Sequence, residues 1–400
     1  MADASESGQW IGRQTRKLRQ VRSGYTPFQE GDVLFAKITP CMENGKGCHA
    51  QGLVNGVGLG STEFHVLRAK PTADARFLYH WLQSDLLRLA AEAMMTGSAG
   101  QRRVPAEFFG RLPIPLLTLP EQRRIAEILD TADRAIGETE VLISKLRQMK
   151  TGLMHDLFTR GLDERGQLRD PNVHPEQFKD SQLGRIPREW EVLPMSGVAL
   201  QSPGSTTIGP FGSNLVAADY RSSGVPVVFV RDIKADAFKW NSEVYVEPDK
   251  ARQLSAHSVE PGDILATKMG LPPCISCVYP EWMPQGIVTA DVIRLRVNYR
   301  LVSNRWLSHF INSAVVSHQV RAITGGVTRP KVTLHDFRGL LTALPSLTEQ
   351  EQVNQLLEAH DARIRAEEAY RDKLKLQKKG LMEDLLTGRV RVKTAQEVGT

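Results

Sequence analysis

The sequence predicts an α+β protein with two related globular domains, each followed by a long helix, and with the two helices pairing as an antiparallel coiled coil. The first observation is a repeat: residues 121–159 and 349–387 align without a gap at an offset of 228 (349 − 121), and about 15 of 39 positions are identical. The second is a helical apolar stripe in both segments. The third is a series of short strand and turn signals before each segment. A repeat this long is no solenoid unit and indicates a duplicated domain with its helix.

Length and composition favour a soluble protein of two or three domains with a polyanionic partner. The chain has 400 residues, 41% of them hydrophobic and 24% charged, and its formal net charge is +6. Its polar start lacks a signal-peptide core, and no stretch approaches the ~18 apolar residues that span a bilayer. Four cysteines do not suggest a disulfide framework. We therefore expect a cytoplasmic protein that makes no membrane contact.

Both repeats begin with the same helix signal. Thr118 with Glu121, and Ser346 with Glu349, fit a capping box, in which the hydroxyl accepts from the N3 amide and the glutamate reaches back. The apolar stripe that follows is close to a coiled-coil seam. Its members are Ile125, Leu129, Ala132, Ile136, Leu142, Ile143, Leu146, Leu153 and Leu157 in the first copy, and Val353, Leu356, Leu357, Ile364, Tyr370, Leu374, Leu381 and Leu385 in the second.

These signals predict spacer helices over residues 118–160 and 346–388, with Gly161 and Gly388 as stop signals. Each helix would be roughly 50–60 Å long at 1.5 Å per residue. A helix of that length cannot be buried by its own small domain, so we expect it to pack against the other long helix of the same chain. Separate packing of each helix on its own domain is the alternative.

The segments before the helices repeat more faintly. The matching pairs are 31–34 with 262–265, 76–81 with 305–310, and 96–104 with 324–332. Each domain should contain short strands, a helix (about 73–95 and 302–323), and a glycine-rich basic loop. The resulting boundaries are a first domain at 1–117, a linker at 161–182, a second domain at 183–345 and a tail at 389–400. The first domain lacks a counterpart for some 45–50 opening residues of the second, so we expect it to be incomplete.

The glycine-rich loops are the candidate DNA-binding surface. Glycine lets backbone approach a ligand closely, and arginine and glutamine carry donors suited to phosphates and base edges. The candidate residues are Lys37, Gly97, Ser98, Gly100, Gln101, Arg102 and Arg103 in the first domain, and Lys268, Gly325, Gly326, Thr328, Arg329 and Lys331 in the second. One such loop would be an ordinary exposed loop; its recurrence in both domains favours function. A basic run, Arg13, Arg16, Lys17, Arg19 and Arg22, is either a phosphate contact or a solvated tail.

Motifs for catalysis are missing from the sequence. There is no Walker-type loop, no Asn/Asp-Pro-Pro-aromatic motif of the methyltransferases that modify amino groups, and no GxSxG, HExxH or kinase set. We therefore assign no catalytic residue. Cys274 and Cys277 form a single CxxC pair, which is weak evidence for zinc, and we expect no metal.

Taken together, these motifs resemble the specificity (S) subunit of Type I restriction-modification enzymes. The resemblance rests on the repeated helix, which starts Glu-Gln and ends Gly-Leu-Met-x-Asp-Leu-[Phe/Leu]-Thr. It rests also on the Gly-Asp-[Val/Ile]-Leu strands, the opening Leu-Gly-x-Ile-Pro-x-x-Trp-Glu-Val at 183–192, and the Thr-Gly loops. It covers the chain from about residue 25 to 390.

The resemblance implies two target recognition domains that each read half of a bipartite sequence in double-stranded DNA. The paired helices would act as a spacer and dock two modification (adenine methyltransferase) subunits, and restriction subunits would join that complex. S-adenosylmethionine, ATP and Mg²⁺ would then be bound by the partner subunits, with no cofactor on this chain. The docking residues would be Glu121, Gln122, Ile125, Leu129, Ile136, Leu146, Glu349, Gln350, Leu357, Ile364 and Leu374. A nucleic-acid-binding regulator unrelated to restriction and a protein-binding scaffold remain as alternatives.

Overall fold

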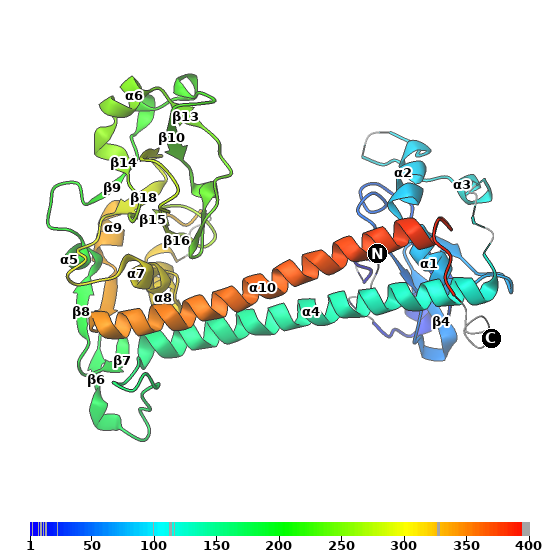
Figure 1. The fold of residues 1–400 in the computed structure, drawn as a ribbon, viewed down its shortest axis with the longest axis horizontal. Coiled ribbons are helices and arrows are strands. Elements are labelled where there is room, and N and C mark those ends of the chain that lie inside the picture. The colour runs from blue at the N-terminus through cyan, green and yellow to red at the C-terminus, as the bar shows by residue number, and fades with distance from the viewer. Residues whose placement is uncertain are drawn as a thin grey trace. The chain divides into compact units, whose positions relative to one another are not determined.

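The computed structural model describes all residues except 2, 7, 9, 11, 13, 22, 99, 112, 113, 116, 326–328 and 394–400. The chain forms two compact units, one of Met1–Ile143 with Ala366–Thr400 (unit 1) and one of Ser144–Arg365 (unit 2). Both units are α+β (Figure 1). Two long helices, α4 (Leu119–Thr159) and α10 (Leu347–Leu385), each contribute residues to both units. None of the helices in the described part of the chain combines the length and apolar composition needed to cross a membrane.

Unit 1 is built on a three-stranded antiparallel sheet with the order β3-β2-β5. Its strands are β2 (Val33–Ala36), β3 (Gly47–His49) and β5 (Phe64–Leu67), beside a second ladder of β1 (Thr26–Gln29) and β4 (Val57–Gly60). Its short helices are α1 (Ala75–Gln83), α2 (Asp85–Ala93) and α3 (Glu107–Gly110). The core joins this sheet and α1 to the start of α4 and the end of α10.

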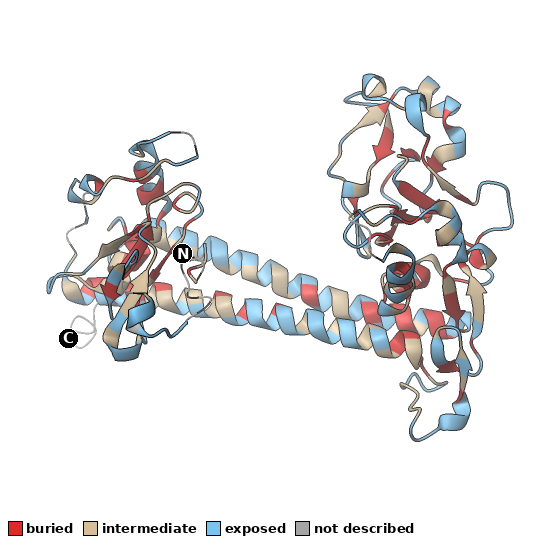
Figure 2. Ribbon diagram, turned by 180° about the vertical axis from the view of Figure 1, so that it is seen from behind, coloured by how far each residue is buried: buried red, intermediate tan, exposed pale blue. Residues whose placement is uncertain are grey.

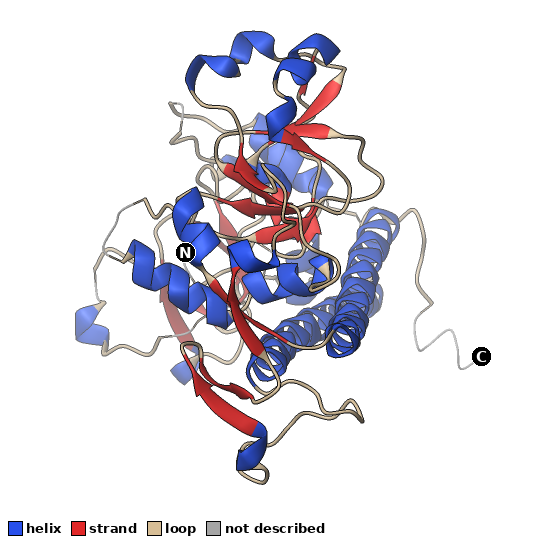
Figure 3. Ribbon diagram, turned by 90° about the vertical axis from the view of Figure 1, so that its left-hand side faces the viewer, coloured by secondary structure: helices blue, strands red, loops and turns tan. Residues whose placement is uncertain are grey.

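Unit 2 contains more strands, arranged around an antiparallel sheet with the order β16-β15-β18-β9. These strands are β9 (Thr206–Ile208), β15 (Ile264–Thr267), β16 (Ser276–Val278) and β18 (Val292–Leu295). A mixed sheet has the order β13-β10-β17-β14, with strands β10 (Val225–Val228), β13 (Tyr245–Val246), β14 (Ser258–Val259) and β17 (Gly286–Val288). Two-stranded ladders join β6 (Phe178–Ser181) to β7 (Gly184–Pro187), β8 (Glu191–Pro194) to β19 (Leu341–Leu344), and β11 (Ile233–Lys234) to β12 (Ala237–Phe238) (Figure 3). The short helices are α5 (Met195–Val198), α6 (Pro248–Gln253), α7 (Asn304–Ile311), α8 (Ala314–Thr324) and α9 (Leu334–Gly339).

The faint repeat in the sequence corresponds to a structural repeat around the central strands β2 and β15. Asp32 precedes β2 and accepts a hydrogen bond from the Gln29 amide (2.7 Å) and two from Arg68 (2.7 and 2.8 Å). Asp263 precedes β15 and accepts from the Glu260 amide in the same way (2.9 Å). The predicted equivalence of the two Gly-Asp strands is therefore confirmed.

The first testable prediction concerns Asp32. Hydrogen bonds from Arg68 lower the pKa of this carboxyl below its ordinary value of 3.8. Its ionisation therefore stabilises unit 1 at pH values above that ordinary pKa, and the contribution is lost as the pH falls through the lower, folded-state pKa. We expect Asp32→Asn to lower the melting temperature at neutral pH. The difference in melting temperature between the variant and the wild type should become smaller in acid, as measured by thermal unfolding across pH. Asp263→Asn is the control, since burial raises the pKa of Asp263; equal behaviour of the two variants would contradict the prediction.

The predicted single helices near 73–95 and 302–323 are each two helices. Ser84 leaves the helical conformation (φ −66°, ψ 142°). Its hydroxyl accepts a hydrogen bond from the Leu87 amide, so Ser84 is the N-cap of α2. Ser313 occupies the same place between α7 and α8 with extended backbone. Serine at a helix N-cap offers the backbone an alternative to continuing the preceding helix.

The two long helices run antiparallel to each other within each unit. In unit 1, Lys378 forms an ion pair with Asp133 (2.5 Å), and Lys375 forms one with Glu140 (2.8 Å). In unit 2, Lys150 forms an ion pair with Asp361 (2.8 Å). The pair Lys150–Asp361 is the pair Lys378–Asp133 with both residues shifted by the repeat offset of 228. The same contact, with the two helices exchanging roles, thus recurs in both units.

The apolar stripes are confirmed at most positions, and Figure 2 shows buried residues recurring along both helices. The stripe prediction is wrong for Leu142, Leu356 and Tyr370, which are exposed. In α10 the buried face follows Val353, Leu357 and Ile364 at steps of four and seven. Leu356 and Tyr370 each lie one position off this register, about 100° around the helix, because an α-helix has 3.6 residues per turn.

The capping boxes form only in part. At α4, Glu121 accepts from the Thr118 amide (2.9 Å), as predicted. At α10, the Ser346 hydroxyl accepts from the Glu349 amide (3.2 Å), but the Glu349 carboxylate turns away. It accepts instead from the Leu162 amide (2.7 Å) and from side chains outside α10.

The prediction of a linker at 161–182 is wrong, because this segment is a folded part of unit 2. Leu162 is buried in the main core and forms a bridge with Leu168. Arg169 forms an ion pair with Glu349 (2.8 Å). The polar and turn-forming residues that suggested a linker lie in the turns around Leu162, Leu168 and Arg169, which attach the segment to unit 2.

Candidate nucleic-acid interface

In both units the structure brings the predicted lysine next to the predicted glycine-rich loop. The Lys37 carbonyl accepts a hydrogen bond from the Val104 amide (2.9 Å), and the Lys268 carbonyl accepts one from the Val332 amide (2.9 Å). One residue further along, a β-bridge joins Ile38 to Arg103 and another joins Met269 to Lys331. In the sequence, the lysine and the glycine-rich loop belong to two separate repeated segments. In the fold they lie next to each other within each unit.

The unit 1 loop is a closed turn. Thr96 and Arg103 exchange two backbone hydrogen bonds (3.0 and 2.8 Å). Gly97 has φ +121°, and a Cβ there would lie 2.8 Å from the Gln101 carbonyl oxygen, so only glycine fits. The exposed residues of this turn include Gly97, Ser98, Gly100 and Gln101.

The two arginines of the unit 1 loop are already paired within the unit. Arg103 makes two hydrogen bonds to Glu63 (3.0 and 2.9 Å), and this contact lowers the pKa of the glutamate. Arg102 lies 3.4 Å from Glu43. The arginines of this loop are therefore partly neutralised, and Lys37 is half-buried, while the DNA-binding role of these residues stays a prediction.

The unit 2 site is more strongly cationic. The side chain of Lys268 is buried; its Nζ donates to the Ala290 carbonyl (3.3 Å) and lies 4.9 Å from the centre of the Phe211 ring. Burial and then the nearby charge of Lys331 lower the pKa of Lys268. Arg329 and Lys331 are exposed, and neither makes an ion pair with a described residue. Uncompensated cations side by side favour an anionic ligand.

Some predicted residues are not described or are not exposed. Gly326 and Thr328 lie outside the described residues, while Gly325 is exposed at the end of α8. Lys268 is buried, with its Nζ 4.9 Å from the centre of the Phe211 ring, so its side chain has little surface for direct contact with a ligand. A cavity of 390 Å³ lies alongside, lined by Tyr220, Phe229 and Arg231 among others, and by Ala290 itself.

Two exposed apolar residues next to this site were missed from the sequence. Phe211 is 61% exposed and Leu271 is 86% exposed. Leu271 lies between Gly270 and the pair Pro272-Pro273. An apolar side chain within such a run of turn-forming residues is the sequence signal that could have marked it, because turns leave side chains at the surface.

Cys274 and Cys277 do not form a joint site. Cys274 belongs to the core cluster that includes Trp306, while Cys277 belongs to the one that includes Tyr279. Burial raises the pKa of each thiol to about 12. In the described part of the chain, no three His, Cys, Asp or Glu side chains are grouped so that they could hold a metal.

We therefore predict that Cys274 and Cys277 are unreactive in the folded protein, because the thiolate is the reactive form and burial disfavours it. Titration with a thiol reagent should label the half-buried Cys41 first, and all four cysteines together only after denaturation. A Cys41→Ser variant is the control and should show almost no early labelling. Rapid labelling of that variant would contradict the prediction.

The residues predicted to dock a partner are mostly used inside the chain. The Gln122 side-chain oxygen accepts from the Asp74 amide (2.9 Å), and the Gln350 side-chain oxygen accepts from the Ser303 amide (2.8 Å). Both glutamines are therefore clamps between a long helix and its own domain. The other predicted docking residues that are buried are Glu121, Ile125, Leu129, Ile136, Glu349, Leu357 and Ile364. Leu146 and Leu374 are half-buried.

The buried residues of this set expose almost no surface for direct contact with a partner, and their docking role stays a prediction. The exposed large apolar residues of the long helices are a different set. They are Val141, Leu142, Met149, Leu347, Leu356, Tyr370 and Leu376. In the sequence these were apolar residues at or beside the main stripe, and only the packing separates the inward face from the outward one.

Comparisons with known proteins find similarity to Type I specificity subunits. Residues 6–148 match the family described as the Type I restriction modification DNA specificity domain. The EcoAI specificity subunit of Escherichia coli is 47% identical over 113 residues, which are 28% of this chain and 19% of that protein. The putative MjaX specificity subunit of Methanocaldococcus jannaschii is 26% identical over 375 residues, covering 91% of this chain and 79% of that protein. The chain thus matches less than a fifth of the EcoAI subunit but most of the MjaX subunit.

Two solved structures share the fold. One, from work on complex assembly and conformational transition of the type I R-M system, has a TM-score of 0.59 at 17% identity and covers 97% of this chain and 90% of that chain. The S subunit of the Type-I restriction-modification system from M. genitalium has a TM-score of 0.52 at 15% identity, covering 96% and 90%. The resemblance to Type I specificity subunits, first recognised from the repeated motifs, is confirmed.

Proposed function

We propose that this chain, a specificity-subunit-like protein, is the DNA-reading subunit of a Type I restriction-modification complex and that each unit reads half of a bipartite target. The observation that carries the proposal is the recurrence, in both units, of a lysine at the end of the central strand against a glycine-rich basic loop. A two-part duplex sequence requires one such surface for each part.

The two surfaces differ in ways that suit sequence discrimination. The unpaired Arg329 and Lys331 of unit 2 can bind phosphates, and arginine can also take guanine O6 and N7 together. The unit 1 loop offers Gln101 as its exposed polar side chain, with its arginines held by Glu63 and Glu43. Different side chains on equivalent loops would give two different half-sites.

The long helices serve in this proposal as the spacer between the half-sites. A 41-residue helix such as α4 is about 60 Å long, which corresponds to about 18 base pairs of B-DNA. The antiparallel contacts within each unit support pairing along the full length of the helices, in a two-domain coiled-coil arrangement. Their exposed apolar residues are the surfaces on which two modification subunits would dock, with restriction subunits joining them.

Catalysis lies outside this chain in the proposal. S-adenosylmethionine, ATP and Mg²⁺ would be bound by the modification and restriction subunits. The chain supplies the positioning that converts a general adenine methyltransferase into a sequence-specific one.

The proposal is tested by co-expressing the tagged chain with the modification subunit of the same genome, followed by mapping of N6-methyladenine. The expected result is a stable complex and methylation of one bipartite motif that requires both proteins. Failure to co-purify, or a methylation pattern that is unchanged when the chain is omitted, would refute it.

A further inference from the structure

A cavity in unit 2 adjoins the loop surface described above and contains an arginine side chain. The cavity measures 390 Å³, and Arg231, Phe229 and Asp291 are among the residues that line it. Ala290 lines it too, and the carbonyl of Ala290 accepts the hydrogen bond from Nζ of Lys268 (3.3 Å). The cavity therefore extends from the Lys268 end of the loop site toward Arg231.

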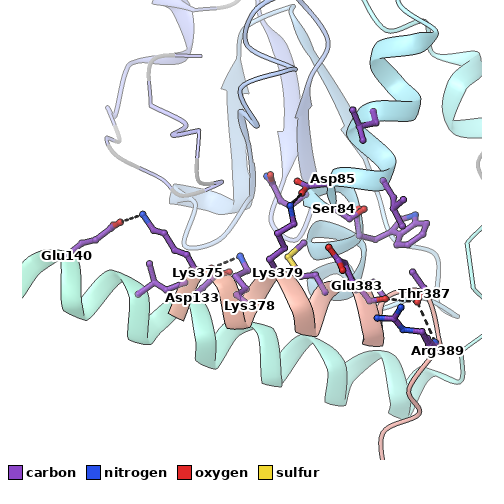
Figure 4. A pocket seen from close by; sticks show the side chains of 17 residues that line it. Ser84, Asp85, Asp133, Glu140, Lys375, Lys378, Lys379, Glu383, Thr387 and Arg389 are labelled. Carbon is purple, nitrogen blue, oxygen red and sulfur yellow. Dashed lines mark hydrogen bonds and ion pairs between the residues drawn. The ribbon is translucent and has the colours of Figure 1, made fainter. Parts of the chain in front are cut away.

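Arg231 is exposed and makes no ion pair with a described residue. The larger cavity of unit 1, which measures 650 Å³ and is bounded by α2, α4 and α10, offers a contrast (Figure 4). The cations that line that cavity are each paired with a carboxylate: Lys375 with Glu140, Lys378 with Asp133, Lys379 with Asp85 and Arg389 with Asp384. Of the two cavities, the one in unit 2 thus has the cation that is available to acceptor atoms of a ligand.

The guanidinium of Arg231 is held in place by two contacts. Its Cζ lies 4.5 Å from the centre of the Phe229 ring, which is a cation–π contact. Its Nε donates a hydrogen bond to the Ser242 hydroxyl (2.8 Å). The two terminal nitrogens, which make no hydrogen bond to a described residue, remain available as donors. A side chain that is already ordered loses little conformational entropy on binding, so more of the contact free energy is kept.

A buried carboxylate positions both residues that hold Arg231. Asp232 is fully buried, and its carboxylate accepts from the hydroxyl (2.7 and 2.6 Å) and the amide (2.9 Å) of Ser242. It also accepts from the Phe229 amide (2.9 Å). The Ser242 hydroxyl can donate to Asp232 and accept from Arg231 at once, since it has one proton and two lone pairs. The orientation of the guanidinium therefore depends on a network inside unit 2.

Asp291 adds a negative charge to the same cavity. It is exposed, and its carboxylate makes no ion pair with a described residue. A carboxylate beside the arginine disfavours a phosphate as the ligand, because the two negative charges repel each other. It favours a ligand that presents acceptors and a donor together. In the major groove a G·C pair does so, since guanine presents O6 and N7 as acceptors and cytosine presents the N4 amino group as a donor.

Given the proposed function, on which this inference rests, we propose that Arg231 is a further specificity-determining residue of unit 2 and reads a guanine. The guanidinium would donate to O6 and N7 together, and Asp291 would accept from N4 of the paired cytosine. Arg329 and Lys331 of the glycine-rich loop would contact the same half-site next to this base pair. Ser242 would be a positioning residue, because it acts on DNA only through Arg231.

The test uses the full chain in complex with the modification subunit, after the methylated motif of the wild-type complex has been mapped. With Arg231→Ala, mapping of N6-methyladenine should show methylation at sites that differ from the motif at one G·C pair of one half-site. Affinity for the target duplex should fall about ten-fold or more, the discrimination expected of one bidentate contact. Affinity for a duplex in which that G·C pair is replaced should change little.

Two further variants separate base reading from a charge effect. Arg231→Lys keeps the charge but loses the planar pair of donors, so we expect it to relax the motif as Arg231→Ala does. Ser242→Ala keeps the arginine but removes the acceptor of its Nε, and it should weaken discrimination at the same base pair. Ser242→Thr retains the hydroxyl and should restore discrimination. Arg231 is exposed, so its variants should fold.

The matched control is Arg300→Ala, which removes the same charge elsewhere on unit 2. Arg300 is exposed and makes no ion pair with a described residue. Its neighbour Tyr299 donates to the Gly262 carbonyl (3.3 Å), before the start of β15, whereas Lys268 follows the end of that strand. Arg300→Ala should leave both the motif and the affinity unchanged.

The outcomes distinguish this inference from the function on which it rests. A wild-type complex that methylates no bipartite motif would refute the proposed function, and base reading by Arg231 with it. A mapped wild-type motif that Arg231→Ala leaves unchanged would overturn base reading alone. Equal loss of affinity on all duplexes, restored by Arg231→Lys, would make Arg231 a phosphate contact and would also overturn it. Relaxation at an A·T pair would overturn the assignment to guanine.

Discussion

Replacing Glu349 by alanine is expected to destabilise unit 2 by about 3–5 kcal/mol, the usual cost of removing one partner of a buried ion pair. Glu349 is 7% exposed, and its carboxylate accepts from the Leu162 amide (2.7 Å), the Trp190 indole (3.1 Å) and Arg169 (2.8 Å). The Arg169 side chain is itself only 9% exposed. The variant therefore removes the nearest carboxylate from the buried Arg169, which keeps only Glu189 at 3.7 Å, and takes their acceptor from the Leu162 amide and the Trp190 indole. Chemical denaturation followed by tryptophan fluorescence measures the loss, since Trp190 reports on this site.

The repeat supplies the control, because Glu121 is the counterpart of Glu349. Glu121 accepts from Thr118 and from Arg391, whose side chain is 63% exposed. Water can solvate that arginine after the change, so Glu121→Ala should cost only about 1 kcal/mol. Equal losses of unfolding free energy in the two variants would show that the buried hydrogen bonds of Glu349 contribute no more than the exposed ones of Glu121.

Replacing Arg329 by alanine is expected to cost about 1–3 kcal/mol of DNA binding and to relax specificity within one half-site. Arg329 is exposed and makes no ion pair with a described carboxylate, and it lies two residues before the exposed Lys331, so its guanidinium is available to a base or phosphate. Affinity should be measured for the complex with the modification subunit, on the target and on duplexes with single base-pair changes, at several salt concentrations.

Arg102→Ala in the unit 1 loop is the matched comparison. Arg102 lies 3.4 Å from Glu43 and 3.9 Å from Glu92, so its charge is partly neutralised and its loss should matter less. An equal loss for Arg329→Ala on all sequences would make Arg329 a phosphate contact. No loss on any sequence would place the unit 2 loop away from DNA.

Several features of the site were predictable because they depend on local sequence. The Gly-Asp pair fixes the start of a central strand through a turn that Asp32 and Asp263 close in the same way. The apolar period of the long helices fixes which residues face inward, with errors of one position at Leu356 and Tyr370. Glycine at position 97 is required by its backbone conformation and its close contact with the loop.

Other features depend on residues distant in sequence and could not be predicted. The pairing of Arg103 with Glu63 joins residues 40 positions apart, and that of Glu349 with Arg169 joins residues 180 apart. Whether a cation is available to a ligand is decided by such pairs, because a neighbouring carboxylate satisfies it first. Similarly, the contact between the buried Lys268 and the Phe211 ring forms only because the loop that contains Phe211 packs next to the end of β15.

The sequence by itself determined the repeat, the α+β class, the two long helices and the resemblance to Type I specificity subunits, since each depends on periodicity or on short motifs. Only the tertiary structure decided which charges remain free, which helix residues are clamps rather than docking contacts, and that 161–182 is part of unit 2. These outcomes depend on packing between segments far apart in the chain, and no local pattern encodes which segments meet.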